Sequence, residues 1–380
     1  MKLGIVNSNF SLGGAQRVAI EIAKGLSLST EYEIDLVDFS GENIFFYEDI
    51  GLCNKIVNPS KKRNTEKICH RLYKYRYKFF KKRFHVSSML QNQIEGLISV
   101  IKERKYDVII LCQGILTTLL PRFKKQFPDI KFIAWQHSSY YTYIKKYNAS
   151  FLEEYLMALE QADEVICLTL EDQRLFQKHN KKTRAIHNPL TIMSNKISNL
   201  KNNTIVFVSR IDTEPKGLDY LIELIKRSPA DWNYGIAGDG KDIAKFKKLI
   251  TENNLNDKLI LKGALVGEDL VNHYLEGSVF VSTSRWEGFG LALTEAMSCG
   301  LPVISFNNSG PKEILDDGKY GILIDKFDID YFFNELEKLM NNENIRKIYQ
   351  QKSLQRANDF SLEAIVAKWL EVLQGETLYG

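Results

Sequence analysis

Short apolar runs rich in β-branched residues alternate with amphipathic helical stretches along nearly all of the 380 residues. Runs such as "YDVIILCQG" and "TIVFVS" are typical of buried strands, and "AQRVAIEIAKGLS" is typical of a helix that connects two strands. Strands that alternate with helices predict α/β structure built on parallel sheets. The chain is longer than a single core usually serves, so we expect two domains of this kind.

The alternation pauses once, in the polar segment 184–203, which Pro189 interrupts. It restarts with "TIVFVSRID", so we predict a first domain over residues 1–190 and a second over residues 191–360. An amphipathic helix in the final segment, 361–380, could stay with the second domain or cross back to the first. Two open parallel sheets imply a cleft at the carboxyl ends of their strands, where such sheets bind ligands.

The composition is that of an ordinary globular protein, with 44% apolar and 26% charged residues and a formal net charge of +4. Its five cysteines are scattered and form no C-x-x-C pair, which argues against a disulfide framework and a zinc site and fits a reducing compartment. The apolar run near the N-terminus is too short for a signal peptide, and none reaches the ~20 residues of a membrane span. We therefore expect a cytoplasmic protein that could still lie on a membrane surface.

Motifs after the predicted strands carry groups that bind anions. In "SLGGAQRVA", Gly13 and Gly14 precede a helix whose unpaired N–H groups favour an anion, although a plain strand-to-helix turn is the alternative. In "SRIDTEPKG", Arg210 at a strand end and Lys216 before a helix suit a diphosphate, with solvated surface cations as the alternative. Gly238, in "AGDG" after the next strand, lets a flat ring or a phosphate approach the backbone.

The strongest motif is "RWEGFGLALTEAMSCG", which follows a buried strand and runs into a helix. Gly288 and Gly290 leave backbone N–H groups exposed beside the start of this helix, which makes a second anion site. Glu295 lies in the first turns of the helix and can accept two hydroxyl groups, while Glu287 can reach a polyol ring held just outside the turn. A nucleotide diphosphate with a sugar at each end fits all of these groups.

Taken together, "GGAQR", "SRIDTEPKG" and the E-x7-E pattern of "EGFGLALTE" resemble the family 4 retaining glycosyltransferases of GT-B fold, of the type that acts in bacterial surface-polysaccharide synthesis. The resemblance covers nearly the whole chain, including the helix at "FSLEAIVAKWLEVL", which in that family crosses back to the first domain. It implies two Rossmann-like domains that face each other across a cleft, the first binding the acceptor and the second the nucleotide-sugar. The departures are mild: Ser209 stands where a glycine is common, and "TEP" precedes Lys216.

The resemblance also implies roles for single residues. Glu295 would hold the donor ribose and Glu287 the transferred sugar, while Arg210 and Lys216 would neutralise the diphosphate. His137 stands where the family often has a histidine facing the donor sugar, and a packed or solvated histidine is the alternative. The predicted catalytic residues are His137, Arg210, Lys216 and Glu287. The predicted donor-binding residues are Gly14, Arg210, Lys216, Gly238, Glu287, Gly288, Phe289, Gly290, Leu291 and Glu295.

Charge accounts for the expected chemistry. Breaking the bond from the sugar to the diphosphate leaves negative charge on the leaving group, which Arg210, Lys216 and helix dipoles can stabilise. Two cations and a dipole can replace a metal ion, so we expect no metal and no cofactor. The triplet Asp328-Ile329-Asp330 matches the D-x-D of metal-dependent transferases, but it precedes a helix far from the other motifs.

A basic and aromatic insert, residues 61–86, carries 11 of the 51 lysines and arginines of the chain and one acidic residue, Glu66. On a helical wheel Ile68, Leu72, Tyr75 and Phe79 form one apolar stripe beside a basic face, and Tyr73, Tyr77, Phe80 and Phe84 form a second. The predicted membrane or acceptor residues on the basic face are Lys67, Arg71, Lys74, Lys78, Lys81 and Lys82. Such a face suits an anionic membrane surface or a pyrophosphate-linked lipid. The alternatives are a solvated face whose apolar stripes pack on the domain, or nucleic-acid binding, which we do not expect because no recognition fold accompanies the patch.

We therefore predict a retaining transferase that moves a sugar from a nucleotide diphosphate, preferably UDP, to a hydroxyl of a lipid-linked oligosaccharide at the inner face of the cell membrane. An epimerase of the same fold would need acid and base carboxylates in the cleft and would change the donor without an acceptor. A nucleotide-binding or membrane-scaffold protein would show no turnover.

Overall fold

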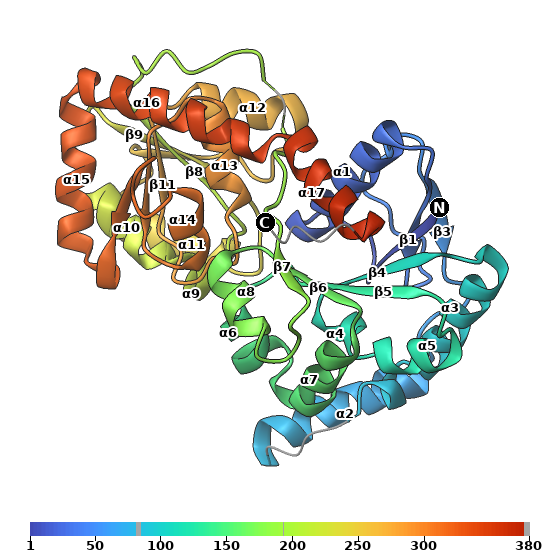
Figure 1. The fold of residues 1–380 in the computed structure, drawn as a ribbon. Helices are drawn as coiled ribbons and strands as arrows, with labels where there is room; N and C mark the ends of the chain where they lie inside the picture. The colour runs from blue at the N-terminus through green and yellow to red at the C-terminus, as the bar shows by residue number, and fades with distance from the viewer. Residues whose placement is uncertain (81–84, 193, 376–380) are drawn as a thin grey trace. The chain divides into compact units, whose positions relative to one another are not determined.

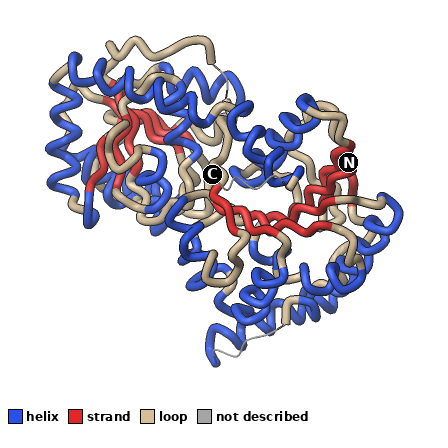
Figure 2. The backbone as a smooth tube through the Cα atoms, in the orientation of Figure 1, coloured by secondary structure: helices blue, strands red, loops and turns tan. Residues whose placement is uncertain are grey.

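A computed structural model of the protein describes residues 1–80, 85–192 and 194–375. The described residues form two compact units, each built around its own parallel β-sheet (Figures 1 and 2). Unit 1 contains Met1–Pro189 and Leu362–Gly380, and unit 2 contains Leu190–Ser361. The boundaries expected from the sequence, after residues 190 and 360, lie beside these positions.

The described part of unit 1 has a sheet of seven parallel strands in the order β3-β2-β1-β4-β5-β6-β7. The buried strands are nearly continuous apolar runs, as in β4, because helices cover both faces of a parallel sheet. The strands are β1 (Lys2–Asn7), β2 (Glu33–Asp38), β3 (Asn54–Val57), β4 (Val108–Cys112), β5 (Lys131–Trp135), β6 (Glu164–Cys167) and β7 (Thr183–Ala185).

Helices α1 and α17 cover one face of this sheet, and the helices from α3 to α7 cover the other, with α2 beyond them (Figure 1). The helices of the unit are α1 (Gly14–Ser29), α2 (Asn64–Phe80), α3 (Gln91–Arg104), α4 (Gly114–Thr117), α5 (Leu120–Gln126), α6 (Tyr140–Thr142), α7 (Leu152–Gln161), α8 (Leu170–Phe176) and α17 (Leu362–Gln374). Short 3-10 turns occupy Ser87–Met89 and Ala149–Phe151, and one π-helical turn occupies Tyr143–Tyr147.

The C-terminal helix α17 packs on α1. A Cβ at Gly25 of α1 would lie 2.5 Å from a methyl carbon of Val366, so the glycine sets this close approach. The Lys131 side chain, at the start of β5, donates a hydrogen bond to the Val372 carbonyl at 2.6 Å. The predicted apolar face of the helix is buried in unit 1 through Ile365, Val366, Trp369 and Val372.

A buried carboxylate joins β2 to α3. Asp35 accepts hydrogen bonds from Arg104 Nε at 2.7 Å and from the Tyr106 hydroxyl at 2.8 Å, and Asn54 of β3 donates to it at 2.8 Å. Burial acts to raise the pKa of Asp35, but the hydrogen bonds from Arg104, Asn54 and Tyr106 outweigh it and hold the pKa below its usual value.

The described part of unit 2 has six parallel strands in the order β10-β9-β8-β11-β12-β13. This is a doubly wound sheet, because the chain builds outward from β8 in one direction and then returns to build outward from β11 in the other. The strands are β8 (Thr204–Val208), β9 (Asn233–Ala237), β10 (Leu259–Leu261), β11 (Val279–Ser282), β12 (Val303–Phe306) and β13 (Ile322–Ile324).

Helices α10, α11 and α15 pack on one face of the second sheet, and α13 packs on α16 (Figure 1). The helices are α9 (Thr213–Lys216), α10 (Leu218–Arg227), α11 (Ile243–Glu252), α12 (Gly267–Leu275), α13 (Leu291–Ser298), α14 (Ser309–Ile314), α15 (Ile329–Asn341) and α16 (Glu343–Ala357), with 3-10 turns at Asp325–Phe327 and Asn358–Phe360. None of the helices in the described ranges combines the length and the hydropathy that crossing a bilayer requires. The prediction of α/β structure with two Rossmann-like sheets is confirmed.

Candidate functional site

The predicted phosphate and sugar residues of unit 2 lie on loops at the carboxyl ends of β8 and β11. These two strands are hydrogen-bonded neighbours at the centre of the sheet, where the strand order reverses. Open α/β sheets bind their ligands at such a point, because the loops diverge there and leave room. The segment after β8 carries Lys216, at the end of the short helix α9, and the loop after β11 carries Glu287.

Lys216 and Glu287 form an ion pair. Lys216 Nζ donates to Glu287 Oε2 at 2.5 Å, and the two side chains are 15% and 20% exposed. Gly217 follows Lys216 with φ of +59°, and a Cβ there would lie 2.0 Å from the Thr283 carbonyl oxygen, so glycine lets the two loops meet. Thr283 Oγ1 also donates to the Lys216 carbonyl at 2.9 Å. The structure therefore brings together the cation predicted for the diphosphate and the carboxylate predicted for the sugar.

Arg210, the second predicted phosphate cation, lies two residues beyond β8 and is exposed. Among the described residues, none forms an ion pair or a hydrogen bond with its guanidinium group. Gly238 follows β9 with φ of +145°, and a Cβ there would lie 1.8 Å from the Ser209 carbonyl oxygen. Gly238 thus permits a close approach between the loop after β9 and the loop after β8. A contact between Gly238 and a donor stays a prediction.

The turn that leads into α13 packs against the first residues of α14. Gly310 N donates to the Glu287 carbonyl at 3.2 Å, and a Cβ at Gly310 would lie 2.0 Å from the Phe289 carbonyl oxygen. Gly290 precedes α13 with φ of +117°, a conformation that favours glycine. Phe289 is buried, and its contact with a donor stays a prediction. The two remaining predicted residues of this turn, Gly288 and Leu291, are half-buried.

Glu295 lies on α13 as predicted, but it is almost fully buried, at 4% exposure. Its Oε1 accepts a hydrogen bond from Thr191 Oγ1 at 2.5 Å, and its Oε2 accepts one from the Tyr274 hydroxyl at 2.8 Å. These two hydrogen bonds hold the Glu295 carboxylate in a fixed orientation on α13. The predicted contact with a ribose stays a prediction.

Sequence reasoning missed Thr191 and Tyr274. Tyr274 lies on α12, 21 residues before Glu295, and belongs to no motif. Thr191 falls in the polar segment 184–203, where the sequence indicates only a domain boundary. A single sequence carries no signal for such contacts, because they depend on how α12 and the boundary segment pack against α13.

In unit 1 the predicted residues follow β1 and β5. Gly14 is the first residue of α1 and is exposed. His137 lies two residues beyond β5, and both of its ring nitrogens are buried with no hydrogen-bond partner among the described residues. Burial lowers the pKa of His137 to about 3, so its imidazole is neutral at pH 7.

A stack of aromatic rings supports His137. The Trp135 ring lies 4.3 Å from the His137 ring, and the Trp369 ring of α17 lies edge-on to Trp135 at 4.7 Å. The His137 backbone N–H donates to the Tyr143 hydroxyl at 3.0 Å. The Trp135 and Trp369 rings thus connect His137 to the C-terminal helix.

Helix α2 forms the main part of the basic insert, and one of its two apolar stripes is exposed. Ile68, Leu72, Tyr75 and Phe79 are each between 56% and 58% exposed, whereas Tyr73 packs against the core of unit 1. The alternative in which both apolar stripes pack on the domain therefore does not hold for the first stripe. Arg71 is exposed. The predicted residues Lys81 and Lys82 lie outside the described residues, as do the side chains of Lys67, Lys74 and Lys78.

The D-x-D triplet has a structural role. Asp328 caps α15 by accepting hydrogen bonds from the backbone of Asp330 and Tyr331, and Asp330 pairs with Arg227 at 2.6 Å. In residues 1–80, 85–192 and 194–375, no group of three or more His, Cys, Asp and Glu side chains is arranged to hold a metal ion.

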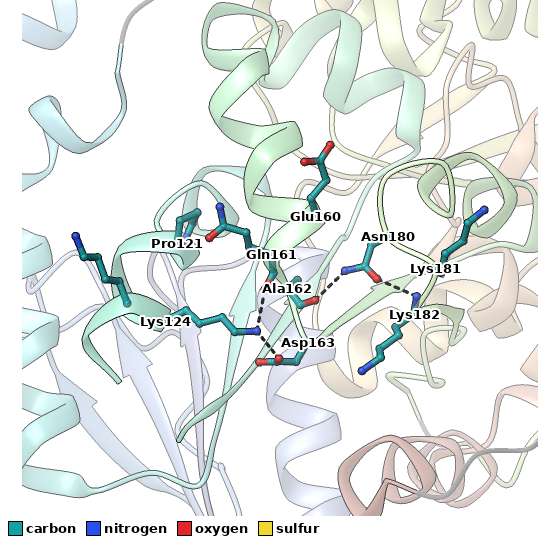
Figure 3. Close-up of a pocket in the computed structure, with 10 residues that line it drawn as sticks. Pro121, Lys124, Glu160, Gln161, Ala162, Asp163, Asn180, Lys181 and Lys182 are labelled. Atoms are coloured by element: carbon teal, nitrogen blue, oxygen red, sulfur yellow. Dashed lines mark hydrogen bonds and ion pairs between the residues drawn. The ribbon is translucent and has the colours of Figure 1, made fainter. Parts of the chain in front are cut away.

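A hollow of about 910 Å³ lies elsewhere, at the amino ends of β5 to β7 (Figure 3). Its lining includes Lys124, Lys125, Lys181 and Lys182, but Lys124 is engaged with Asp163 and with the Gln161 carbonyl at the end of α7. Lysines at helix C-termini offset the negative end of the helix dipole, which accounts for part of this charge. The hollow contains none of the predicted site residues.

Comparison with known proteins matches the chain to two families. The model described as "Glycosyltransferase Family 4" matches residues 12–192, and the model described as "Glycosyl transferases group 1" matches residues 191–356. An uncharacterized glycosyltransferase of Haemophilus influenzae is 28% identical over 98% of this chain and 99% of its own length. The amylovoran biosynthesis glycosyltransferase AmsD of Erwinia amylovora is 29% identical over 46% of this chain and 48% of its own length.

Among solved structures, HepE from Anabaena in complex with UDP-glucose superposes with a TM-score of 0.76 at 17% identity. The match covers 99% of this chain and 100% of HepE, so the two proteins share the fold through both units. The two family models meet at residues 191–192, next to the boundary between the units at 189 and 190. With both sheets matched in this way, the chain belongs to the family 4 glycosyltransferases of GT-B fold.

Proposed function

We propose that the protein transfers a sugar, with retention of anomeric configuration, from a UDP-sugar to a hydroxyl of a lipid-linked glycan during surface-polysaccharide synthesis. The observation that carries the proposal is the Lys216–Glu287 ion pair at the point where the strand order of unit 2 reverses. HepE was solved with UDP-glucose, and AmsD acts in amylovoran biosynthesis, which supports the donor class and the pathway class.

The ion pair suits a donor that carries both phosphates and sugar hydroxyls. Without a donor, Lys216 and Glu287 neutralise each other. When the donor binds, the diphosphate offers Lys216 a stronger partner, and the hydroxyls of the sugar offer donors to the released Glu287 carboxylate. Arg210, exposed in the segment between β8 and α9, supplies a second positive charge. As the bond to the sugar breaks, these cations and the N-terminus of α13 stabilise the charge on the leaving diphosphate.

We propose that no metal ion takes part, because two cations and a helix N-terminus supply the positive charge in this arrangement. His137 would serve as a neutral hydrogen-bonding group toward the donor sugar, since its lowered pKa keeps the imidazole uncharged at pH 7. The acceptor hydroxyl would attack on the face from which the diphosphate leaves, so no second carboxylate at glycosidase spacing is required.

Replacement of Lys216 tests the proposal. Lys216→Ala should slow transfer by ~10²-fold or more, because a preorganised charge at the leaving group is lost. Lys226→Ala, which removes an exposed lysine paired with Glu223 on the same unit, is the matched control and should keep full activity. Transfer would be assayed as nucleotide release across a panel of donors, with and without lipid-linked acceptors. Full activity of Lys216→Ala would contradict the role, and a donor altered without acceptor would indicate an epimerase instead.

The exposed stripe of α2 supports a membrane-bound acceptor. Four apolar side chains in line along one helix, beside Arg71, form the kind of face that inserts at a bilayer interface. Each basic residue close to an anionic surface adds about 1 kcal/mol to the attraction. We propose that α2 holds the enzyme at the inner face of the cell membrane, where lipid-linked acceptors are found.

Co-sedimentation with vesicles of anionic lipid tests this surface. Replacing Leu72, Tyr75 and Phe79 by serine should abolish binding to the vesicles. Serine at Ile260 and Ile348, two equally exposed apolar residues of unit 2, is the matched control and should leave binding intact. Equal sedimentation of both variants would remove α2 from the proposal while leaving the transferase activity untouched.

A further inference from the structure

Arg285, between β11 and Glu287, makes an unusual number of contacts for a partly exposed residue. Its two Nη atoms form a bidentate pair with Asp219 of α10, at 2.8 and 2.5 Å. Nη1 also donates to the Glu214 carbonyl at 3.1 Å. The guanidinium group lies 4.3 Å from the centre of the Tyr220 ring. One arginine thus reaches a carboxylate, a carbonyl and an aromatic ring on a single neighbouring segment.

The segment that Arg285 contacts is the one that carries Lys216. The Arg285 backbone N–H donates to the Pro215 carbonyl at 2.8 Å, so backbone and side chain of the same residue bind both sides of Lys216. Helix α9 is only four residues long, and so short a helix has little stability of its own. The position of Lys216 therefore depends on contacts from outside the helix, and Arg285 supplies two of them, to the Glu214 and Pro215 carbonyls.

The contacts are anchored in the core of unit 2. The Tyr220 ring lies edge-on to Phe306 at 5.0 Å, and Phe306 is fully buried on β12. Arg285 is therefore held between a fixed aromatic ring and Asp219. Burial acts to raise the pKa of Asp219, but the hydrogen bond and charge of Arg285 outweigh it and lower the pKa, so the pair stays charged at neutral pH.

We propose that Arg285 and Asp219 form a positioning clamp that holds Lys216 in place to receive the leaving diphosphate. This inference rests on the proposed role of Lys216 in the transferase reaction. Neither clamp residue touches the donor in this proposal; each acts through the backbone of residues 213–219. The clamp also couples the two loops of the site, because Arg285 lies two residues before Glu287.

An ordinary surface ion pair is the alternative to a clamp. The Arg285 and Asp219 side chains are 24% and 52% exposed, and most pairs with such exposure contribute about 0–1 kcal/mol to stability. A surface pair predicts no change in turnover when it is broken. A clamp predicts a fall in kcat out of proportion to any loss of stability, because a shift of about 1 Å in a catalytic charge costs up to ~10²-fold in rate.

Kinetics of three variants test the clamp. Arg285→Ala and Asp219→Ala should each lower kcat by ~10- to 100-fold with the KM for the donor changed less than about threefold. The kcat of the double variant should fall no further than that of either single variant, because both substitutions remove the same Arg285–Asp219 contact. Arg285→Lys should restore activity only in part, since an ammonium group cannot form the bidentate contact. Arg227→Ala breaks the Arg227–Asp330 pair on the same unit and should keep full activity.

Amide hydrogen exchange gives a readout that needs no substrate. The amides of residues 213–219 should exchange faster in Arg285→Ala and in Asp219→Asn than in the native chain. Asp219→Asn keeps the size of the side chain. Arg227→Ala should exchange like the native chain. Unchanged exchange in this segment overturns the clamp whatever the kinetics. Faster exchange with unchanged kcat also overturns it, because the contact is then only structural. A fully active Lys216→Ala, in contrast, overturns the proposed function and not the contact between the loops.

Discussion

At the scale of single residues, hydrogen bonds between side chains determine how the predicted site residues are oriented. Lys216 and Glu287 are oriented by each other, and Glu295 is oriented by two hydroxyl groups. Glu295 is thus preorganised in the absence of a donor, which lowers the cost of ordering it when the donor binds, whereas Lys216 and Glu287 would exchange each other for the donor.

Tyr274 offers a test of this preorganisation. Tyr274→Phe removes the hydroxyl that donates to Glu295 Oε2, so the carboxylate loses one of the groups that fix its orientation. We expect the KM for the donor to rise about fivefold, which corresponds to about 1 kcal/mol, with kcat nearly unchanged. Tyr234→Phe removes a similarly buried hydroxyl, bonded to Ser228 in the same unit, and serves as the control. An unchanged KM in Tyr274→Phe would show that Glu295 needs no such support.

His137 should make unit 1 sensitive to acid. Its pKa is about 3 in the folded protein and about 6.5 in an unfolded chain. Between these values the unfolded state binds a proton that the folded state does not, so the free energy of unfolding falls as the pH drops from about 6.5 toward 3. In His137→Gln this fall should be smaller than in the native chain, because glutamine binds no proton in this range. Denaturant unfolding at a series of pH values measures the difference. Since the imidazole is neutral at pH 7, we expect no inflection in kcat near pH 6.5 from this residue.

At the scale of helices and strands, buried polar contacts decide how edge elements join the sheet. Asp35 connects β2 to β3 through Asn54 and to α3 through Arg104. A buried ion pair contributes little over an apolar contact of the same shape, but removing one partner is costly because the other is left uncompensated.

Asp35→Ala should therefore lower the free energy of unfolding of unit 1 by about 3 kcal/mol. Glu33→Ala removes a half-exposed carboxylate that pairs with the same Arg104, and it should cost at most about 1 kcal/mol. Because the pKa of Asp35 is lowered in the folded state, its contribution is fully present above about pH 4 and is lost as the pH falls through the folded pKa. Urea unfolding of both variants at pH 7 and pH 3 tests the size and the sign.

The elements also show what a single sequence can and cannot predict. The runs "TIVFVS", "WNYGIAG", "KLILKG", "VFVST", "LPVIS" and "GILI" predict all six strands of the second sheet, because each is a short apolar run between helices. In the first sheet the apolar runs predict β1, β2, β4, β5 and β6 but not β3 or β7: "NKIV" is half polar, and β7 overlaps the polar segment that indicates a domain boundary. Both are edge strands, where one side faces solvent and the apolar signal is weak. The exposure of one stripe of α2 was likewise beyond prediction, since helical periodicity does not tell which of two apolar stripes faces the core.

The candidate site divides in the same way. The motifs around Lys216, Glu287 and Glu295 were found because strand ends, glycines and charged residues are visible in sequence. Arg285 is the first residue of "RWEGFG", but the motif predicts no role for it, because its partner Asp219 lies 66 positions away in the chain. Contacts over such separations depend on tertiary packing and leave no periodic pattern.

At the scale of the whole molecule, the chain passes from unit 1 to unit 2 and returns at its C-terminal helix. The fold of unit 1 is therefore complete only when α17 packs on α1. Trp369→Ala should destabilise unit 1 by about 3–5 kcal/mol, because it leaves a large cavity beside Trp135. Lys368→Ala, on the exposed side of the same helix, should have no effect.

Calorimetry and amide exchange distinguish the units in this experiment. Trp369→Ala should lower the unfolding temperature of unit 1 and speed exchange in β1 and β5, while strands β8 and β11 of unit 2 keep their native exchange rates. An equal loss in both units would mean that they unfold as one cooperative body.

Unit 2 is one continuous segment, residues 190–361, and it stands in the chain between the two parts of unit 1. The segment can therefore be exchanged as a block. Splicing a homologous segment at 189/190 and 361/362 would leave α17 on its native partner. Chimeras made in this way would recombine unit 2 of one transferase with unit 1 of another, whereas a single crossover near residue 190 would graft a foreign terminal helix onto α1.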